Sequence, residues 1–285
     1  MVRLARVLCQ PHPWRGYHGK VIPRSRTVSL LALGAICLAA CSTEKPPEPQ
    51  LKPLTLKEQV SNVVKSPDGY TVNWAGVLAN ANPWHFGEHV VATVVGRDAA
   101  GAEVVKMEQP LDAVPPGGSL AFTGQTSATK KPVKVTIGYR PAQWRPAARI
   151  VSAFKQFPVT RVQTLPQKNG SYLITGYIAN PYRLPASTLV VSALLRDKAG
   201  KLLGGGSTFA DDVKAGRPPR FILTIEGLPK GAEVARTEVT ARTWGSTARP
   251  YEDLALGGAV PLHTIKPTTP PFAVDRGSQI VTGKQ

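Results

Sequence analysis

Two histidines flank a glutamate in the stretch HFGEH, residues 85–89. Some zinc peptidases carry two histidine ligands and a catalytic glutamate in this order, and they present all three on a helix. Here Pro83 and Gly87 disfavour a helix, and the β-branched run over residues 90–95 follows at once. On an extended strand His85 and His89 would lie about 13 Å apart, too far for two ligands of one zinc ion. The stretch therefore predicts a polar loop between strands and no metal site.

The three cysteines, Cys9, Cys37 and Cys41, all lie near the N-terminus, so the sequence predicts neither a disulfide framework nor a cysteine-based zinc site. Two arginines precede an apolar run over residues 28–40, which ends in small residues. This is the order of a secretory signal. The run is also shorter than the roughly 20 residues that a membrane-spanning helix needs.

The end of this run, Leu38-Ala39-Ala40-Cys41, resembles the bacterial lipobox. The resemblance implies that a diacylglycerol is attached to the Cys41 thiol, that the chain is cut just before it, and that the mature protein sits in the cell envelope, anchored in membrane lipid. Two or three acyl chains anchor a protein firmly, whereas one chain anchors it only marginally. Residues 1–40 are thus expected to be a Sec-type signal peptide. Residues 1–23 fit an n-region poorly, so either the n-region is long or translation starts further downstream. Residues 41–56 are rich in proline and predict a semi-rigid tether.

An internal repeat accounts for most of the remaining chain. GVLANANP at residues 76–83 matches GYIANPYR at 176–183, and VVATVVGRDAAGAEVV at 90–105 matches LVVSALLRDKAGKLLG at 189–204. The order of these matches is the same in both halves, which predicts two units over 57–145 and 156–247. A linker over 146–155 joins them, and a mostly irregular, proline-rich tail over 248–285 follows.

Both units read as antiparallel β-structure. Apolar residues alternate with polar ones over residues 133–139 and 221–225, as in half-buried strands. Asp-Gly at 68–69, Asn-Gly at 169–170 and the D-x-x-G segments at 98–101 and 197–200 lie where hairpin turns are needed. Short strands with frequent turns predict an all-β chain of two tandem immunoglobulin-like β-sandwiches.

The pattern G-x-(V/I)-x-N, a long apolar strand, D-x-x-G and a later glycine before x-F is similar to the FxLYD-type domains of bacterial envelope proteins. The resemblance covers both units. It implies immunoglobulin-like sandwiches in a lipoprotein that acts as a binding module.

No catalytic pattern accompanies this scaffold. The chain has no G-x-S-x-G motif, and the glycine-rich LGGGST at 203–208 is followed by no helix that would complete a phosphate site. It predicts instead an edge strand or a bulge. The sequence thus predicts a protein that is not an enzyme and uses no cofactor. Among the aromatic residues, Trp84 and Tyr182 fall in equivalent loops and are the candidates for an exposed binding contact, and the others are expected mainly in the cores.

The chain is strongly basic, with a formal charge of +17, of which +11 remains when residues 1–40 are removed. Arg140, Arg145 and Arg149 gather at the predicted junction and are candidate contacts for anionic envelope polymers or lipids. A merely solvated face is the alternative. Nucleic acid is not expected, because the signal directs the protein out of the cytoplasm.

The sequence therefore predicts a lipid-anchored, non-enzymatic binding or structural module of the envelope, which contacts anionic polymers, lipids or another envelope protein. The alternatives are an architectural subunit of a secretion or pilus assembly, or an envelope enzyme with its site at the junction over residues 140–158.

Overall fold

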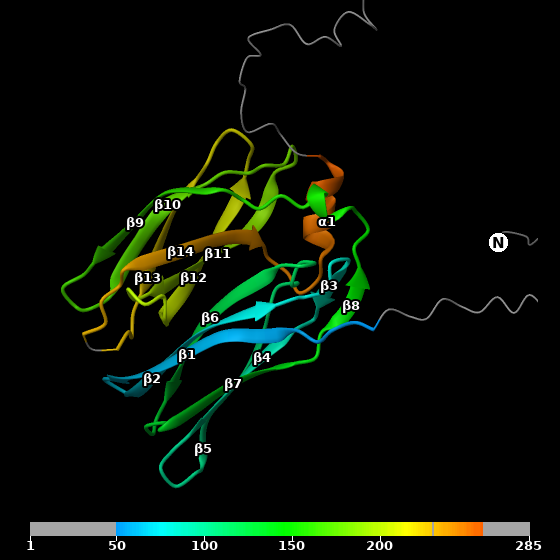
Figure 1. Cartoon of the computed structure of the whole chain (residues 1–285). Coiled ribbons are helices and arrows are strands. Elements are labelled where there is room, and N and C mark those ends of the chain that lie inside the picture. The colour runs from blue at the N-terminus through cyan, green and yellow to red at the C-terminus, as the bar shows by residue number, and fades with distance from the viewer. Residues whose placement is uncertain (1–49, 230, 259–285) are drawn as a thin grey trace, which may run out of the picture. The chain divides into compact units, whose positions relative to one another are not determined.

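The computed structural model describes residues 50–229 and 231–258 (Figure 1). Cys41, the predicted signal peptide and most of the predicted tether lie outside these residues. The described part consists almost entirely of antiparallel strands, with one short α-helix. None of its helices has the length and apolar character needed to cross a membrane.

The first sandwich has two three-stranded sheets and a small strand pair at one end. One sheet has the order β1-β2-β6, with β1 (Thr55–Ser66), β2 (Gly69–Ala79) and β6 (Ser119–Ala128). The other has the order β5-β4-β7, with β4 (Val91–Arg97), β5 (Glu103–Pro110) and β7 (Lys134–Arg140). The pair is formed by β3 (His85–Glu88) and β8 (Gln143–Pro146). Apolar side chains that alternate along the strands fill the space between the sheets, among them Val72, Trp74, Leu78, Val94, Leu120 and Phe122.

The second sandwich repeats this plan. Its sheets have the orders β13-β10-β9 and β12-β11-β14. The strands are β9 (Val159–Pro166), β10 (Tyr172–Ile178), β11 (Ala186–Arg196), β12 (Leu202–Val213), β13 (Arg220–Ile225) and β14 (Arg236–Thr243). A 3₁₀ turn, η1 (Val151–Ala153), lies between the sandwiches in sequence, and helix α1 (Arg249–Leu256) follows β14. This helix lies in the segment predicted to be mostly irregular; Pro250 suits its first turn, and Leu254 and Ala255 pack into the second core.

The predicted all-β fold of two sandwiches is confirmed. In each half the chain passes from one sheet to the other and back again, which is the alternation of immunoglobulin-like sandwiches. The predicted turns are also present: Gly101 and Gly200 have φ of 83° and 81° at the tips of equivalent hairpins. Such values are rare for other residues.

The repeated asparagines have the same role in both halves. The Asn80 side-chain amide donates to the carbonyls of His85, at 2.7 Å, and Val114, at 3.3 Å. Asn180 donates to Leu184, at 2.8 Å, and Val213, at 2.7 Å. Both asparagines are buried. Each amide therefore ties together two segments that would otherwise leave buried carbonyl groups without partners.

The two sandwiches pack through non-equivalent sheets. Sheet β1-β2-β6 of the first lies against sheet β12-β11-β14 of the second (Figure 1). Strand β11 is therefore buried on both faces, with Leu194 directed at the first sandwich and Leu195 at the second core. Leu194 and Leu202 form a small shared core with Ala75 and Ala121.

The glycine-rich stretch at 203–208 lies in β12, an edge strand of this interface, as predicted. A Cβ atom at Gly205 would lie 2.8 Å from the Thr123 methyl carbon of the first sandwich and 2.8 Å from the Ala193 carbonyl oxygen. The absence of a side chain at this position lets the two sheets approach each other.

The loop predicted for HFGEH is wrong in one respect, because residues 85–88 form strand β3. They pair with β8, which is distant in sequence. Glu88 of β3 and Arg145 of β8, whose side chains are hydrogen-bonded, are 57 residues apart. The sequence pattern of so short a strand does not reveal so distant a partner.

Candidate binding cleft

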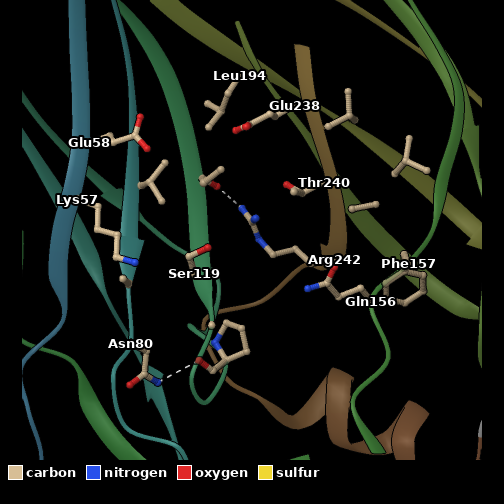
Figure 2. A pocket seen from close by; sticks show the side chains of 18 of the residues that line it. Lys57, Glu58, Asn80, Ser119, Gln156, Phe157, Leu194, Glu238, Thr240 and Arg242 are labelled. Carbon is tan, nitrogen blue, oxygen red and sulfur yellow. Dashed lines mark hydrogen bonds between the residues drawn. The ribbon is translucent and has the colours of Figure 1, made fainter. Parts of the chain in front are cut away.

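A cleft of about 1320 Å³ lies between the two sandwiches. The first sandwich contributes residues of β1, β2 and the start of β6, and the second contributes β14 and the end of β11. Residues 156–159 and Tyr251 of helix α1 complete the lining. Figure 2 shows the polar side chains of both sandwiches directed into this space.

Arg196 joins the two walls at one end of the cleft. Its guanidinium binds Glu58 of β1 through both Nη atoms, at 2.5 and 3.1 Å, and Glu238 of β14 through Nε, at 3.0 Å. The hydrogen bond from Arg196 holds the pKa of Glu58 below its usual value, against the opposing effect of burial. Arg196 also donates to the Gly200 carbonyl, the same contact that Arg97 makes to Gly101 in the first repeat.

Arg242 forms the floor of the cleft. It projects from β14 toward the first sandwich (Figure 2). There its Nε donates to Asp112 at 2.9 Å and its Nη2 donates to the Ala121 carbonyl. Burial lowers the pKa of the Arg242 guanidinium, while the neighbouring Asp112 carboxylate raises it. Within the described part of the chain Nη1 has no hydrogen-bond partner, which leaves one donor group for a ligand.

The rim of the cleft is polar and has a surplus of positive charge. Its lining includes four basic side chains, Lys57, Arg196, Arg236 and Arg242, and two acidic ones, Glu58 and Glu238. Ser119, Thr240 and Gln156 add hydroxyl and amide groups that both donate and accept hydrogen bonds. Lys57 and Arg236 are exposed at the entrance, and Arg236 forms an ion pair with Glu238. This arrangement suits a polar ligand that carries negative charge.

Of the two aromatic residues expected to be exposed, the structure exposes one. Trp84 is 61 % exposed, next to β3. Tyr182 is fully buried, so its assignment as an exposed contact is wrong. Its ring packs against Phe157 and Tyr251, and its hydroxyl donates to the Lys155 carbonyl at 2.8 Å. Desolvation at this site raises the pKa of Tyr182.

The three arginines of the junction do not form one basic face. Arg145 is held by Glu88 at 3.2 Å and Glu252 at 2.5 Å, and so ties β8 to β3 and α1. Its guanidinium thus has a structural role, and its assignment as a binding residue stays a prediction. Arg140 pairs with Glu108 on the outer sheet of the first sandwich. Arg149 is exposed beyond β8 and stays a candidate contact.

The glutamate of HFGEH has a structural role. Glu88 is buried and accepts hydrogen bonds from Arg145 and, at 2.7 Å, from the backbone N–H of Ala248. It therefore attaches the segment before α1 to the first sandwich. Within residues 50–229 and 231–258 no group of three or more histidine, cysteine, aspartate or glutamate side chains is placed to hold a metal ion.

Sequence reasoning did not find the cleft. The sequence draws attention to Arg196, because the dipeptide Arg-Asp at this position is repeated at Arg97. The repeat does not show, however, that Arg196 and not Arg97 contacts the other sandwich. Arg242 and Asp112 have no signal, since they are separated by 130 positions and neither lies in a repeated motif.

No family model and no curated protein matches the chain. Among solved structures, the chain is similar to the N-terminal CBM22-1-CBM22-2 tandem domain from Paenibacillus barcinonensis Xyn10C, at 10 % sequence identity. The match covers 72 % of this chain and 91 % of that chain, with a TM-score of 0.15. A likeness at this TM-score carries no functional information.

Proposed function

We propose that the protein is a lipid-anchored, non-enzymatic binding module of the bacterial envelope, and that it holds an anionic polymer segment in the cleft between its sandwiches. The observation that supports this most directly is the cleft itself, about 1320 Å³ in volume and lined by four basic and two acidic side chains. Its walls come from different sandwiches, which the Arg196 and Arg242 contacts hold together in the absence of a ligand. A site fixed in this way binds without a large ordering cost.

The proposed ligand follows from the charge of the cleft. Exposed Lys57 attracts an approaching polyanion, and Arg236 adds to this attraction although it is paired with Glu238. Further in, Arg242 offers an N–H group, and Ser119 and Thr240 offer hydroxyl groups, to phosphate or carboxylate oxygens.

Charge reversal at the entrance tests this proposal. The wild-type lining has four basic and two acidic side chains, and the variant Lys57→Glu/Arg236→Glu has two basic and four acidic ones. We expect it to weaken binding of polygalacturonate and of inorganic polyphosphate by about tenfold or more, corresponding to about 1.4 kcal/mol. Binding by the wild-type chain should also weaken as salt rises, because exposed charges are screened. Fluorescence anisotropy with labelled polymer measures both effects.

The matched control is Lys130→Glu/Lys131→Glu, which makes the same charge change at exposed positions outside the cleft. A general attraction to the basic surface predicts equal losses in both double variants. That result, or binding of neutral dextran as tightly as of the polyanions, contradicts the proposal.

The lipid anchor is tested separately at Cys41. Cys41→Ser removes the thiol that accepts the lipid, so we expect the protein to leave the membrane fraction or to accumulate as its precursor. Fractionation and radiolabelled palmitate incorporation measure this, with Cys37→Ser as the control that keeps its anchor. Palmitate incorporation into the Cys41→Ser protein would show that the lipobox assignment is wrong.

A further inference from the structure

Two exposed aromatic side chains lie side by side on the second sandwich, apart from the cleft entrance. Phe209 of β12 is 59 % exposed and Trp244, which follows β14, is 58 % exposed. Their ring centroids are 6.3 Å apart, and the rings meet edge to face at 87°. The two rings flank β11, which lies between β12 and β14. Adjacent exposed aromatic rings form an apolar patch of the kind that marks a ligand-binding surface.

The pair belongs to the sheet face that covers the first sandwich. Asp211 of β12 lies opposite Thr188 of β11, and the Thr188 hydroxyl donates to Asp211 Oδ1 at 2.8 Å. Phe209 is two residues from Asp211 and so projects from the same face. The backbone N–H of Trp244 donates to the Thr188 carbonyl at 3.2 Å, which places the indole at the other side of β11. The face therefore continues past the first sandwich as an aromatic surface with a hydroxyl and a carboxylate in its middle.

Trp244 is held in place although it is exposed. The next residue, Gly245, donates its N–H to Asp112 Oδ1 at 3.0 Å and accepts the N–H of Ala113 at 2.9 Å. Both partners belong to the first sandwich. The backbone next to the indole is thus hydrogen-bonded to the first sandwich through both its N–H and its carbonyl group. Ligand binding therefore does not have to order this backbone segment.

A small polar hollow continues inward from the two rings. Its volume is about 90 Å³, and Ser192, Ser207 and Thr123 contribute hydroxyl groups to its lining. The Ser192 hydroxyl is buried and has no hydrogen-bond partner among the described residues. A buried hydroxyl without a partner is rare, and the hollow has room for water or for a polar group of a ligand.

The chemistry of this surface fits a sugar ring. A pyranose has an apolar face of C–H groups, which carry slight positive charge and pack on the electron-rich face of an indole. Its hydroxyl groups project around the rim, where the exposed Asp211 carboxylate accepts hydrogen bonds and the exposed Ser207 hydroxyl accepts and donates them. A free anion is disfavoured by the Asp211 carboxylate. A stable protein partner would bury about 800 Å² of surface on this side, far more than two rings provide.

We infer that Trp244, Phe209 and the adjoining hollow form a second binding site, for a neutral glycan chain. One sugar ring stacks on Trp244 next to Phe209, and its hydroxyl groups bond to Asp211 and to Ser207 of the hollow. The site uses neither Lys57 nor Arg236, the two residues on which the test of the anion-binding cleft rests, although Arg242 lines both the hollow and the cleft.

The test uses the chain purified from membranes in detergent, titrated with hexasaccharides of β-1,4-linked glucose and of β-1,4-linked N-acetylglucosamine. We expect at least one of them to bind by calorimetry, with little effect of salt because the ligand is uncharged. Trp244→Ala should weaken that binding by about tenfold or more, as is typical of a central tryptophan. Trp244→Phe should retain part of it. Thermal denaturation should change little, since the indole is exposed.

Trp84→Ala is the matched control, because Trp84 is 61 % exposed but has no aromatic neighbour among the ring pairs of the described residues. It should bind the hexasaccharide like the wild type. The inference is overturned if neither hexasaccharide binds at about 1 mM, or if Trp84→Ala and Trp244→Ala lose binding equally. It is also overturned if Trp244 is needed only for a cation such as choline, which would make the site a cation–π site.

Discussion

Replacing Asp112 with alanine is expected to lower the free energy of unfolding by about 3–5 kcal/mol. The Asp112 and Arg242 side chains are only 11 % and 16 % exposed, and they bond at 2.9 Å across the interface of the two sandwiches. Without Asp112 the guanidinium stays buried with no countercharge, and the N–H of Gly245 loses its acceptor. Urea denaturation followed by circular dichroism measures the loss.

The control is the exposed pair Arg97–Glu103, whose side chains are 49 % and 41 % exposed. Glu103→Ala should cost about 0–1 kcal/mol, because water solvates the remaining arginine. A further variant separates the cost of the unpaired charge from that of the lost contact. In Asp112→Ala/Arg242→Met no charge stays buried, so much of the stability should return. Equal losses in Asp112→Ala and Glu103→Ala would contradict the assignment of the Asp112–Arg242 pair as a buried link.

Much of the fold is predictable because it depends on local patterns. Alternating apolar residues mark the strands, and glycines mark the hairpins at 101 and 200. The repeat adds a check on these predictions, because a structural role assigned to a residue in one half should also hold for the equivalent residue in the other half. Asn80 and Asn180 satisfy it, since each clamps the equivalent backbone carbonyl, that of Val114 or Val213.

The site is much less predictable, because it arises where the repeats differ. The outer face of β4 carries Arg97, paired with a neighbour on its own sheet, whereas the equivalent Arg196 of β11 bonds to Glu58 of the other sandwich. A repeat shows that two arginines correspond, but it does not show which one will be buried. The sequence likewise does not distinguish Trp74, which is buried in the first core, from Trp244, which is 58 % exposed.

The interface itself has one local signature, the glycine run of β12, and its physical role is testable. Gly205→Ala adds a single Cβ atom that would lie 2.8 Å from both the Thr123 methyl carbon and the Ala193 carbonyl oxygen. The oxygen belongs to the backbone of β11, the neighbouring strand of the same sheet, and cannot rotate away, whereas the methyl carbon belongs to the first sandwich. The added Cβ atom must therefore displace β12 within its sheet and push the two sheets apart. We expect a loss of about 1–3 kcal/mol in the free energy of unfolding, as in other overpacked interiors.

Gly138→Ala is the control for the change of residue type. It lies in β7, in the outer sheet, where an added Cβ atom would meet only the Thr93 hydroxyl, at 3.1 Å. Alanine in a strand is favoured over glycine by about 0.5–1 kcal/mol, so this variant should be as stable as the wild type or slightly more stable. Amide hydrogen exchange locates the effect: in Gly205→Ala it should rise in β6, β11 and β12, which meet at the interface, and stay unchanged in β4. A Gly205→Ala protein as stable as Gly138→Ala would mean that the two sandwiches are not packed closely at β12. The cleft between them would then lack the fixed walls on which the proposed binding depends.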